Sequence, residues 1–281
     1  MMRSMTKTIG KTNANAAMLC VAIGWLAFTV LAGCATTKPA DPEVSDHDPF
    51  EPVNRKIHRV NDIADNWVAK PVTEAYVSYT PRPIRNSVSN FFDNVAYPSV
   101  ILNDFLQGKG GQGVEDLGRF GVNTTFGFLG IWDMATPLGL KAHDEDFGQT
   151  LAMWGMEKSP YLVLPFIGPS TVRDAPNLGV TAVTNILFYV PNPYVVPVAL
   201  LGFIDYRAGV DEAVTFRDAT AVEPYLFTRE AYLQHRRFLI YDGKPPVDED
   251  LLLDDPFNDL EVEEPLREET GKAQDSSDRN E

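Results

Sequence analysis

Residues 178–190, LGVTAVTNILFYV, and residues 194–204, YVVPVALLGFI, decide the fold class, because both segments are apolar on nearly every side. Pro191-Asn192-Pro193 separates them as a turn. A helix that is apolar all round is buried either in protein or in a membrane. Each segment is shorter than the roughly 20 residues that cross a bilayer. Two interpretations follow: a helical hairpin at the centre of a soluble core, or helices in contact with lipid.

The segments before and after these two apolar stretches show the spacing of apolar residues that is typical of helices. Apolar residues between positions 53 and 68 recur at three- and four-residue spacing, which predicts an amphipathic helix that stops near Pro71. A second helix is expected to start near Thr80, with Pro81 in its first turn and Pro98 bending or interrupting it. Further helices are predicted over residues 114–125 and 221–240. Strand alternation of any length is missing from the sequence, so the predicted fold is mostly α.

Residues 126–161 form a long excursion that is rich in glycine and aromatic residues and begins FGFLGIWD at 126–133. An irregular segment of this length inside a domain is usually functional or disordered, and its aromatic content argues against disorder. We interpret residues 126–140 as a candidate lining or gate. Gly127 and Gly130 would form its hinge and Asp133 its polar rim. An ordinary turn with a helix-capping aspartate is the alternative.

The N-terminal region has the pattern of a bacterial lipoprotein signal. The sequence LAGC at 31–34 closes an apolar segment that follows Arg3, Lys7 and Lys11. Residues 1–33 are therefore predicted to be removed, and Cys34 to receive a diacylglyceryl lipid, the one covalent group expected on this protein. Ala35 follows where aspartate would favour retention at the inner membrane, so an outer-membrane location is predicted. Two or more acyl chains give stable anchoring.

The composition of the remaining chain separates it into three regions and excludes several kinds of partner and site. Residues 34–48 read as a lipidated tether, residues 49–243 as the folded body, and residues 244–281 as an acidic disordered tail, because 14 acidic residues face three basic ones from position 248 onward. The formal net charge of −15 argues against a nucleic-acid partner. The two cysteines lie in the signal and at the lipidation site, which excludes disulfides, thiol nucleophiles and zinc–thiolate sites in the body.

The sequence offers no positive sign of catalysis or of a metal site. The four histidines are not paired at ligand spacing, and HDED at 143–146 is interpreted as a solvated polar turn. Glu115 and Asp116 are interpreted as surface charge. Ser159 and Ser170 each lie next to proline, where a turn or cap role suffices. We therefore predict that the protein is not an enzyme.

Six segments together resemble the MlaA/VacJ family of outer-membrane lipoproteins. They are DPFEPVNR at 48–55; YP at 97–98 with NDFLQG at 103–108; RF at 119–120 with NT at 123–124; FGQTL at 147–151 with WG at 154–155; PYLVLPFIGPSTVRD at 160–174; and EPY at 223–225 with REAY at 229–232. They occur in order over the whole body. Ser159 is a small departure, because the family more often has glycine there.

The resemblance implies a ring-like bundle of amphipathic and apolar helices lying in the periplasmic leaflet of the outer membrane. Such a protein removes mislocalised phospholipids from the outer leaflet and passes them through an internal channel to a soluble periplasmic carrier. The carrier delivers them to an inner-membrane ABC transporter complex, so lipid asymmetry is maintained, and trimeric porins accompany the lipoprotein. A polar passage inside an apolar exterior suits this task, because a headgroup crosses hydrocarbon only at high cost.

Two other classes of function remain as alternatives. A non-transporting scaffold lipoprotein would hold the envelope together through protein contacts. A lipid hydrolase or acyl-transfer enzyme would need a nucleophile and a base, and its activity would be abolished by Ser170→Ala.

Overall fold

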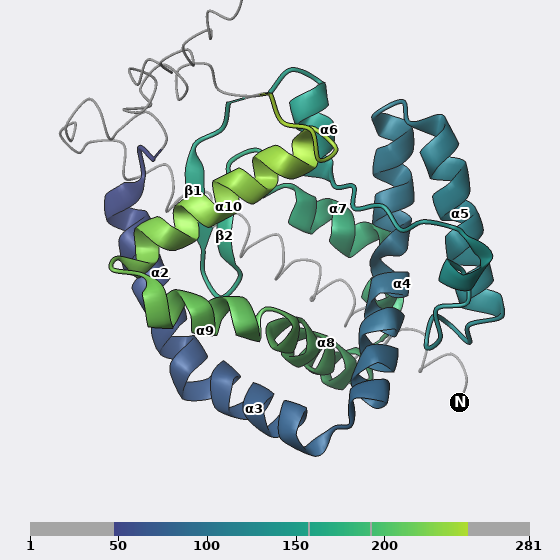
Figure 1. Cartoon of the computed structure of the whole chain (residues 1–281), viewed down its shortest axis with the longest axis horizontal. Helices are drawn as coiled ribbons and strands as arrows, with labels where there is room; N and C mark the ends of the chain where they lie inside the picture. The colour runs from purple at the N-terminus through teal and green to yellow at the C-terminus, as the bar shows by residue number, and fades with distance from the viewer. Residues whose placement is uncertain (1–47, 157, 192, 247–281) are drawn as a thin grey trace, which may run out of the picture.

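A computed structural model describes residues 48–156, 158–191 and 193–246. Most of it is helical, and the helices follow one another around a ring, as Figure 1 shows. They are α2 (Glu51–Ala64), α3 (Lys70–Tyr79), α4 (Arg82–Leu106), α5 (Gly110–Thr125), α6 (Phe147–Met153), α7 (Asn177–Thr184), α8 (Val195–Gly209), α9 (Asp211–Thr220) and α10 (Pro224–Ile240). The mostly α, ring-like fold is therefore confirmed. The predicted signal, Cys34 and nearly all of the tether and tail lie outside the described residues.

The first helix does not stop near Pro71, so that prediction is wrong. A π-helical segment, Asp65–Ala69, joins α2 directly to α3. Its closing hydrogen bond runs from the Lys70 N–H to the Asp65 carbonyl, a spacing of five residues. Proline normally clashes with the carbonyl four residues before it, and the wider π turn removes that conflict. The chain thus continues along the left and lower rim of the ring in Figure 1.

Helix α4 forms the opposite side of the ring and runs unbroken through Pro98, which was expected to bend or interrupt it. It begins at Arg82, directly after Pro81, close to the predicted start. After a turn at Gly108, α5 returns along α4 and packs against it. Helices α6, α7 and α8 also contact α4, and this packing holds the proline-containing helix in one continuous piece.

A two-stranded hairpin, which the sequence did not predict, lies inside the ring of helices. Strand β1 (Tyr161–Leu164) pairs with β2 (Gly168–Thr171) in antiparallel register, with Tyr161 opposite Thr171. The excursion before it is irregular as expected, apart from a 3₁₀ turn at Thr136–Leu138 and the short helix α6. The strands are only four residues long, too short for alternation to stand out in the sequence.

Two asparagines of α2, two helical turns apart, bind the outward-facing backbone of β1. The Asn54 amide donates to the Tyr161 carbonyl over 3.1 Å and accepts from the Val163 N–H over 2.9 Å. Asn61 repeats the pattern with the Leu164 carbonyl, at 2.9 Å, and the N–H of Phe166, at 2.8 Å. The side chains of one helix thus take the place of a neighbouring strand.

Asn61→Ala is expected to destabilise the protein by about 1–2 kcal/mol, because both of its hydrogen bonds to the hairpin are lost. Asn66→Ala is the matched control, since the Asn66 amide bonds only the carbonyl of Asp62 on its own helix turn. Thermal unfolding of the two purified variants measures the difference. Equal midpoints would contradict a role for Asn61 in holding the hairpin.

A small apolar core lies where the hairpin meets α2 and α10. Tyr161, Val163 and Tyr225 are buried there, and Ile57 packs against them. Asp48, the first described residue, is buried beside this core and accepts hydrogen bonds from Asn54, at 2.8 Å, and from the Tyr225 hydroxyl. Asp48 is therefore fastened to both α2 and α10 before the first helix begins.

The described residues bury mainly polar and charged side chains, which is the reverse of the pattern in a soluble protein. Twenty-one buried residues are polar or charged and eight are apolar, whereas charged residues are rarely buried unless paired. The most apolar segments show the inversion best. No residue of α7 is buried, and in α8 the buried residues are Asp205 and Arg207. The interpretation of residues 178–204 as a soluble-core hairpin is therefore wrong.

The buried charges of α8 are paired with the surrounding helices. Asp205 accepts hydrogen bonds from the hydroxyls of Tyr76 and Ser89, both at 2.8 Å. Arg207 binds the carboxylate of Asp65 at 2.6 and 2.9 Å. The buried charges of α8 thus contact the neighbouring helices, while most of its apolar residues remain exposed or partly exposed. Within the described residues, no helix is both long and apolar enough to cross a membrane.

Candidate functional site

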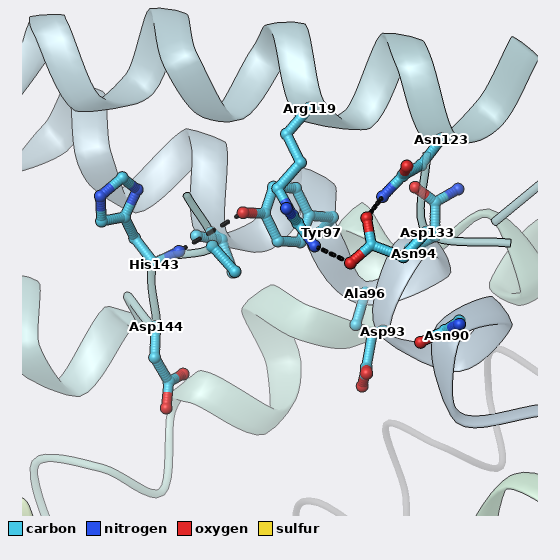
Figure 2. Close-up of a pocket in the computed structure, with 12 residues that line it drawn as sticks. Asn90, Asp93, Asn94, Ala96, Tyr97, Arg119, Asn123, Asp133, His143 and Asp144 are labelled. Carbon is cyan, nitrogen blue, oxygen red and sulfur yellow. Dashed lines mark hydrogen bonds and ion pairs between the residues drawn. The ribbon is translucent and has the colours of Figure 1, made fainter. Parts of the chain in front are cut away.

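A polar cavity of about 280 Å³ lies between α4, α5 and the chain segment 133–144 (Figure 2). The polar residues of the α4 wall are Asn90, Asp93, Asn94 and Tyr97, and Ala96 and Val100 also line it. Their three- and four-residue spacing places them on one face of the helix. Arg119 and Asn123, one turn apart on α5, form a second wall. The cavity therefore arises where the polar faces of two adjacent helices meet the returning chain.

At one corner of the cavity, Arg119 and Asp133 form an ion pair. The Arg119 guanidinium lies 2.7 Å from the Asp133 carboxylate and also donates to the Leu140 carbonyl at 2.7 Å and the Thr136 hydroxyl at 2.9 Å. Asn123 donates to Asp133 over 3.2 Å. Burial alone would raise the pKa of Asp133, but hydrogen bonds from Thr136, Arg119 and Asn123 lower it to about 2. Asp133 is consequently ionised and saturated with donors.

A buried acidic network lies behind the α4 wall. The Tyr97 hydroxyl donates to Asp116 over 2.7 Å, and the His143 Nδ1 lies 3.0 Å from the same carboxylate. Asp116 is fully buried, so the interpretation of this residue as surface charge is wrong. Residues 143–146 are likewise no solvated turn, because Glu145 is 5% exposed and accepts from Lys109 and Gln112.

Two carboxylates of the cavity, those of Asp93 and Asp144, form no hydrogen bond or ion pair with any described residue. Figure 2 shows both side chains pointing away from Arg119 and Asn123. The surrounding protein raises the pKa of Asp93 by desolvation, and the negative charges of Asp205 and Asp144 raise it further. Desolvation, with the charge of Asp146, also raises the pKa of Asp144. Both side chains are exposed, so water can hydrate the two carboxylates.

Arg236 of α10 fixes the segment that holds Asp144. Its guanidinium binds Asp146 at 2.5 and 3.0 Å and Asp174 at 2.9 Å. Asp146 also accepts from the Gln149 N–H at 2.8 Å and so caps α6. Gly148 fits closely over this group, since a Cβ there would lie 2.2 Å from an Asp174 oxygen. Arg236 thereby connects the segment at residues 144–146, which borders the cavity, to α10.

The structure brings together only part of the predicted gate. Asp133 lines the cavity, whereas Gly127 and Gly130 lie in the turn beside it. A Cβ on Gly127 would lie 2.1 Å from the Trp132 carbonyl oxygen. Phe128, Leu129 and Gly130 all have positive φ, at 54°, 59° and 91°. The two glycines are therefore held in close packing, and their gating role stays a prediction.

Gly130→Ala is expected to cost at least about 2 kcal/mol, because φ is +91° and the new Cβ would lie 2.3 Å from that of Asn94. Gly121→Ala is the control, since a Cβ there meets nothing within 4 Å and alanine favours the helix. Denaturant unfolding separates the two variants. A Gly130→Ala protein as stable as the wild type would show that this turn is not packed as described.

Several cavity residues were missed from the sequence. Arg119 and Asn123 occur in a segment that carried the family resemblance, but they were given no role. The polar stripe of Asn90, Asp93, Asn94 and Tyr97 was detectable by its helical spacing. Asp144 was assigned to a polar turn, and its place at the cavity depends on contacts with α4 and α10 that the sequence does not reveal.

A metal site does not form at the cavity among the described residues. Among the described residues, no group of three or more histidine, cysteine, aspartate or glutamate side chains could hold a metal ion. Ser170, the nucleophile of the hydrolase alternative, is buried in β2 and donates to the Thr171 carbonyl at 3.4 Å. The cavity offers recognition groups instead: carboxylates, amides and one neutralised guanidinium.

Comparison with known proteins gives consistent matches. A profile of the family described as MlaA lipoprotein matches residues 46–239. Two proteins named intermembrane phospholipid transport system lipoprotein MlaA, from Shigella flexneri and Escherichia coli (strain K12), are each 34% identical over 224 residues, which cover 78% of this chain and 88% of theirs. A Haemophilus influenzae protein of the same name is 28% identical over 242 residues, covering 84% and 96%.

A solved structure shows the same arrangement of elements. It is described as the structural basis for maintenance of bacterial outer membrane lipid asymmetry. It aligns with a TM-score of 0.60 at 30% identity and covers 69% of this chain and 98% of that chain.

Proposed function

Because this chain belongs to the MlaA lipoprotein family, we propose that it removes mislocalised phospholipids from the outer leaflet of the outer membrane and passes them inward. In this proposal the lipid moves through a passage inside the ring to a soluble periplasmic carrier, and retrograde transport maintains lipid asymmetry. Cys34 supplies the lipid anchor, and a porin trimer accompanies the protein. The body lies in the periplasmic leaflet.

The observation that supports the proposal best is the inverted burial of the ring. Large apolar side chains are exposed on α7, the 3₁₀ turn Ile186–Tyr189 and α8, among them Leu178, Phe188 and Leu200. Short helices with such faces suit one leaflet, where apolar side chains contact acyl chains and the polar side remains hydrated. A large exposed apolar surface otherwise marks an interaction site.

The polar cavity provides the second requirement. A phospholipid headgroup carries charge, and moving an unpaired charge through hydrocarbon is costly. Amides of α4 and α5 and the Asp93 carboxylate of α4 offer hydrogen bonds along the cavity. A headgroup passing there exchanges water for protein partners, while the acyl chains keep apolar surroundings.

The test is the phospholipid content of the outer leaflet in cells that lack the protein. Surface-exposed aminophospholipid, labelled with a membrane-impermeant amine reagent, should accumulate in the deletion and also in cells with Cys34→Ala. The wild-type gene should restore the low level. An unchanged outer leaflet in the deletion would exclude the transport function and favour the scaffold alternative.

A further inference from the structure

The tip of the hairpin, residues 165–167, lies in the longest of the six segments that carry the family resemblance. The sequence PFIGP at 165–169 contains no polar or charged side chain. Phe166 is 69% exposed and Ile167 is 56% exposed. The small core beside β1 includes neither of them. Two large apolar side chains at this tip therefore remain outside the packed part of the hairpin.

Phe166 has a backbone conformation that a bulky residue rarely adopts. The Ile167 N–H donates to the Leu164 carbonyl at 3.3 Å and closes a turn with Pro165 and Phe166 at its centre. The φ of Phe166 is +63°. Positive φ at the second central position is typical of a type II turn, where glycine is the usual residue. A phenylalanine thus occupies a position in which glycine would be less strained.

Asn61 of α2 holds this turn through the backbone alone. Its amide accepts from the Phe166 N–H at 2.8 Å and donates to the Leu164 carbonyl at 2.9 Å. Neither bond involves the Phe166 side chain, which is left available for another contact. Backbone strain that the surrounding structure holds in place is often found at ligand-binding positions. The turn therefore presents an apolar ring that the described residues leave mostly exposed.

The tip and the polar cavity lie on different sides of the ring. In Figure 1 the hairpin lies beside α2, on the left, whereas α4 and α5, which enclose the cavity, are on the right. A phospholipid has the same division into a polar headgroup and apolar acyl chains. The amides of the cavity suit the headgroup. The tip offers no side-chain hydrogen bond, so its partner must be apolar.

We propose that Phe166 and Ile167 contact the acyl chains of a phospholipid inside the ring and so position it for transport. The inference rests on the proposed transport function and names the part of the lipid that the hairpin binds. Contact with acyl chains removes the two side chains from water. This attraction has no preferred direction, so another large apolar residue should replace Phe166.

The first experiment separates this contact from folding. Phe166→Gly removes the ring and relieves the positive φ, so the purified lipoprotein should unfold at a temperature no lower than the wild type. In cells lacking the native gene, the same variant should let surface-exposed aminophospholipid rise toward the level of the deletion. Phe166→Leu should restore most of the transport, because it keeps an apolar side chain at the tip.

Val222→Gly is the matched control. It removes a fully exposed apolar side chain from the connection between α9 and α10, away from the hairpin tip. Transport by this variant should equal that of the wild type. Loss of transport in Val222→Gly as well would overturn the assignment to the tip.

Photocrosslinking identifies the group that covers the tip. With p-benzoylphenylalanine in place of Phe166, illumination of cells labelled with radioactive phosphate should give a phospholipid adduct of the lipoprotein. An adduct with a protein would instead make the tip a docking surface for that protein and would overturn the inference. The absence of any adduct would overturn it too.

The outcomes separate the two proposals. A deletion with an unchanged outer leaflet would refute the transport function itself. If the deletion accumulates phospholipid but Phe166→Gly transports normally, the tip contacts only the surrounding leaflet, and the acyl-chain inference alone fails. A lower unfolding temperature of Phe166→Gly, or a Phe166→Leu protein as defective as Phe166→Gly, would also overturn that inference alone.

Discussion

Arg236→Met is expected to destabilise the protein by about 3–5 kcal/mol, the usual cost of removing one partner from a buried charge cluster. Arg236 is 6% exposed and is the cation shared by Asp146 and Asp174. Burial would raise the pKa of Asp174, but Arg236 and Arg173 hold it below its usual value. Without the guanidinium, the carboxylates of Asp146 and Asp174 would lie close together in a desolvated environment.

Thermal unfolding of the purified lipoprotein measures this loss. Arg237→Met is the control, because that neighbour on α10 lies nearer the surface and donates to the Pro246 carbonyl. Neutralising the two acids as well, in Arg236→Met/Asp146→Asn/Asp174→Asn, should recover part of the lost stability. A triple variant no better than the single one would show that Arg236 acts by packing instead of charge.

Asp104→Asn is expected to stabilise the protein at pH 8 and to have little effect near pH 4. Asp104 and Asp116 are both fully buried between α4 and α5 and share a side-chain hydrogen bond. Desolvation, the bond to Asp116 and the charges of Asp116 and Glu145 raise the pKa of Asp104 to about 7. Gln112 donates to the Oδ1 of Asp104 at 2.8 Å. Asparagine can reproduce both bonds without ionising.

The pH dependence follows from that raised pKa. A carboxyl whose pKa is higher in the folded state stabilises the fold below its unfolded value of 3.8, and this contribution is lost as the pH rises through about 7. The wild type should therefore lose at most about 1.4 kcal/mol per pH unit relative to Asp104→Asn in this window. Unfolding midpoints at pH 4, 6 and 8 test the slope, with Glu74→Gln as the control. Parallel curves would rule out a shared proton at this pair.

The sequence predicts the helices of this fold much better than it predicts their junctions. Apolar spacing is a local signal, so the helices predicted around residues 53–68, 114–125 and 221–240 were found. The continuation through Pro71 depends on a π turn, and the hairpin at residues 161–171 depends on Asn54 and Asn61, more than 100 residues away. Neither feature leaves a periodic pattern.

The cavity residues show the same contrast between local signals, which the sequence reveals, and distant contacts, which it does not. Asp133 was selected because it ends a conspicuous aromatic segment, and it does line the cavity. Asp116 was treated as equivalent to its neighbour Glu115, yet Tyr97 and His143, 19 and 27 residues away, enclose only Asp116. Whether a carboxylate is buried, paired or exposed depends on such distant partners, so the sequence alone did not distinguish Asp116 from Glu115.

The contacts of Asn54 and Asn61 also bear on how the chain avoids association with other copies of itself. A two-stranded sheet usually leaves a row of unpaired amides and carbonyls to which another chain can add, and exposed rows of this kind seed aggregation. On β1, asparagine side chains of α2 occupy these groups from Tyr161 to Phe166. A side-chain amide satisfies the backbone but cannot extend the ladder. The hairpin is therefore closed to strand addition on this side once α2 has docked.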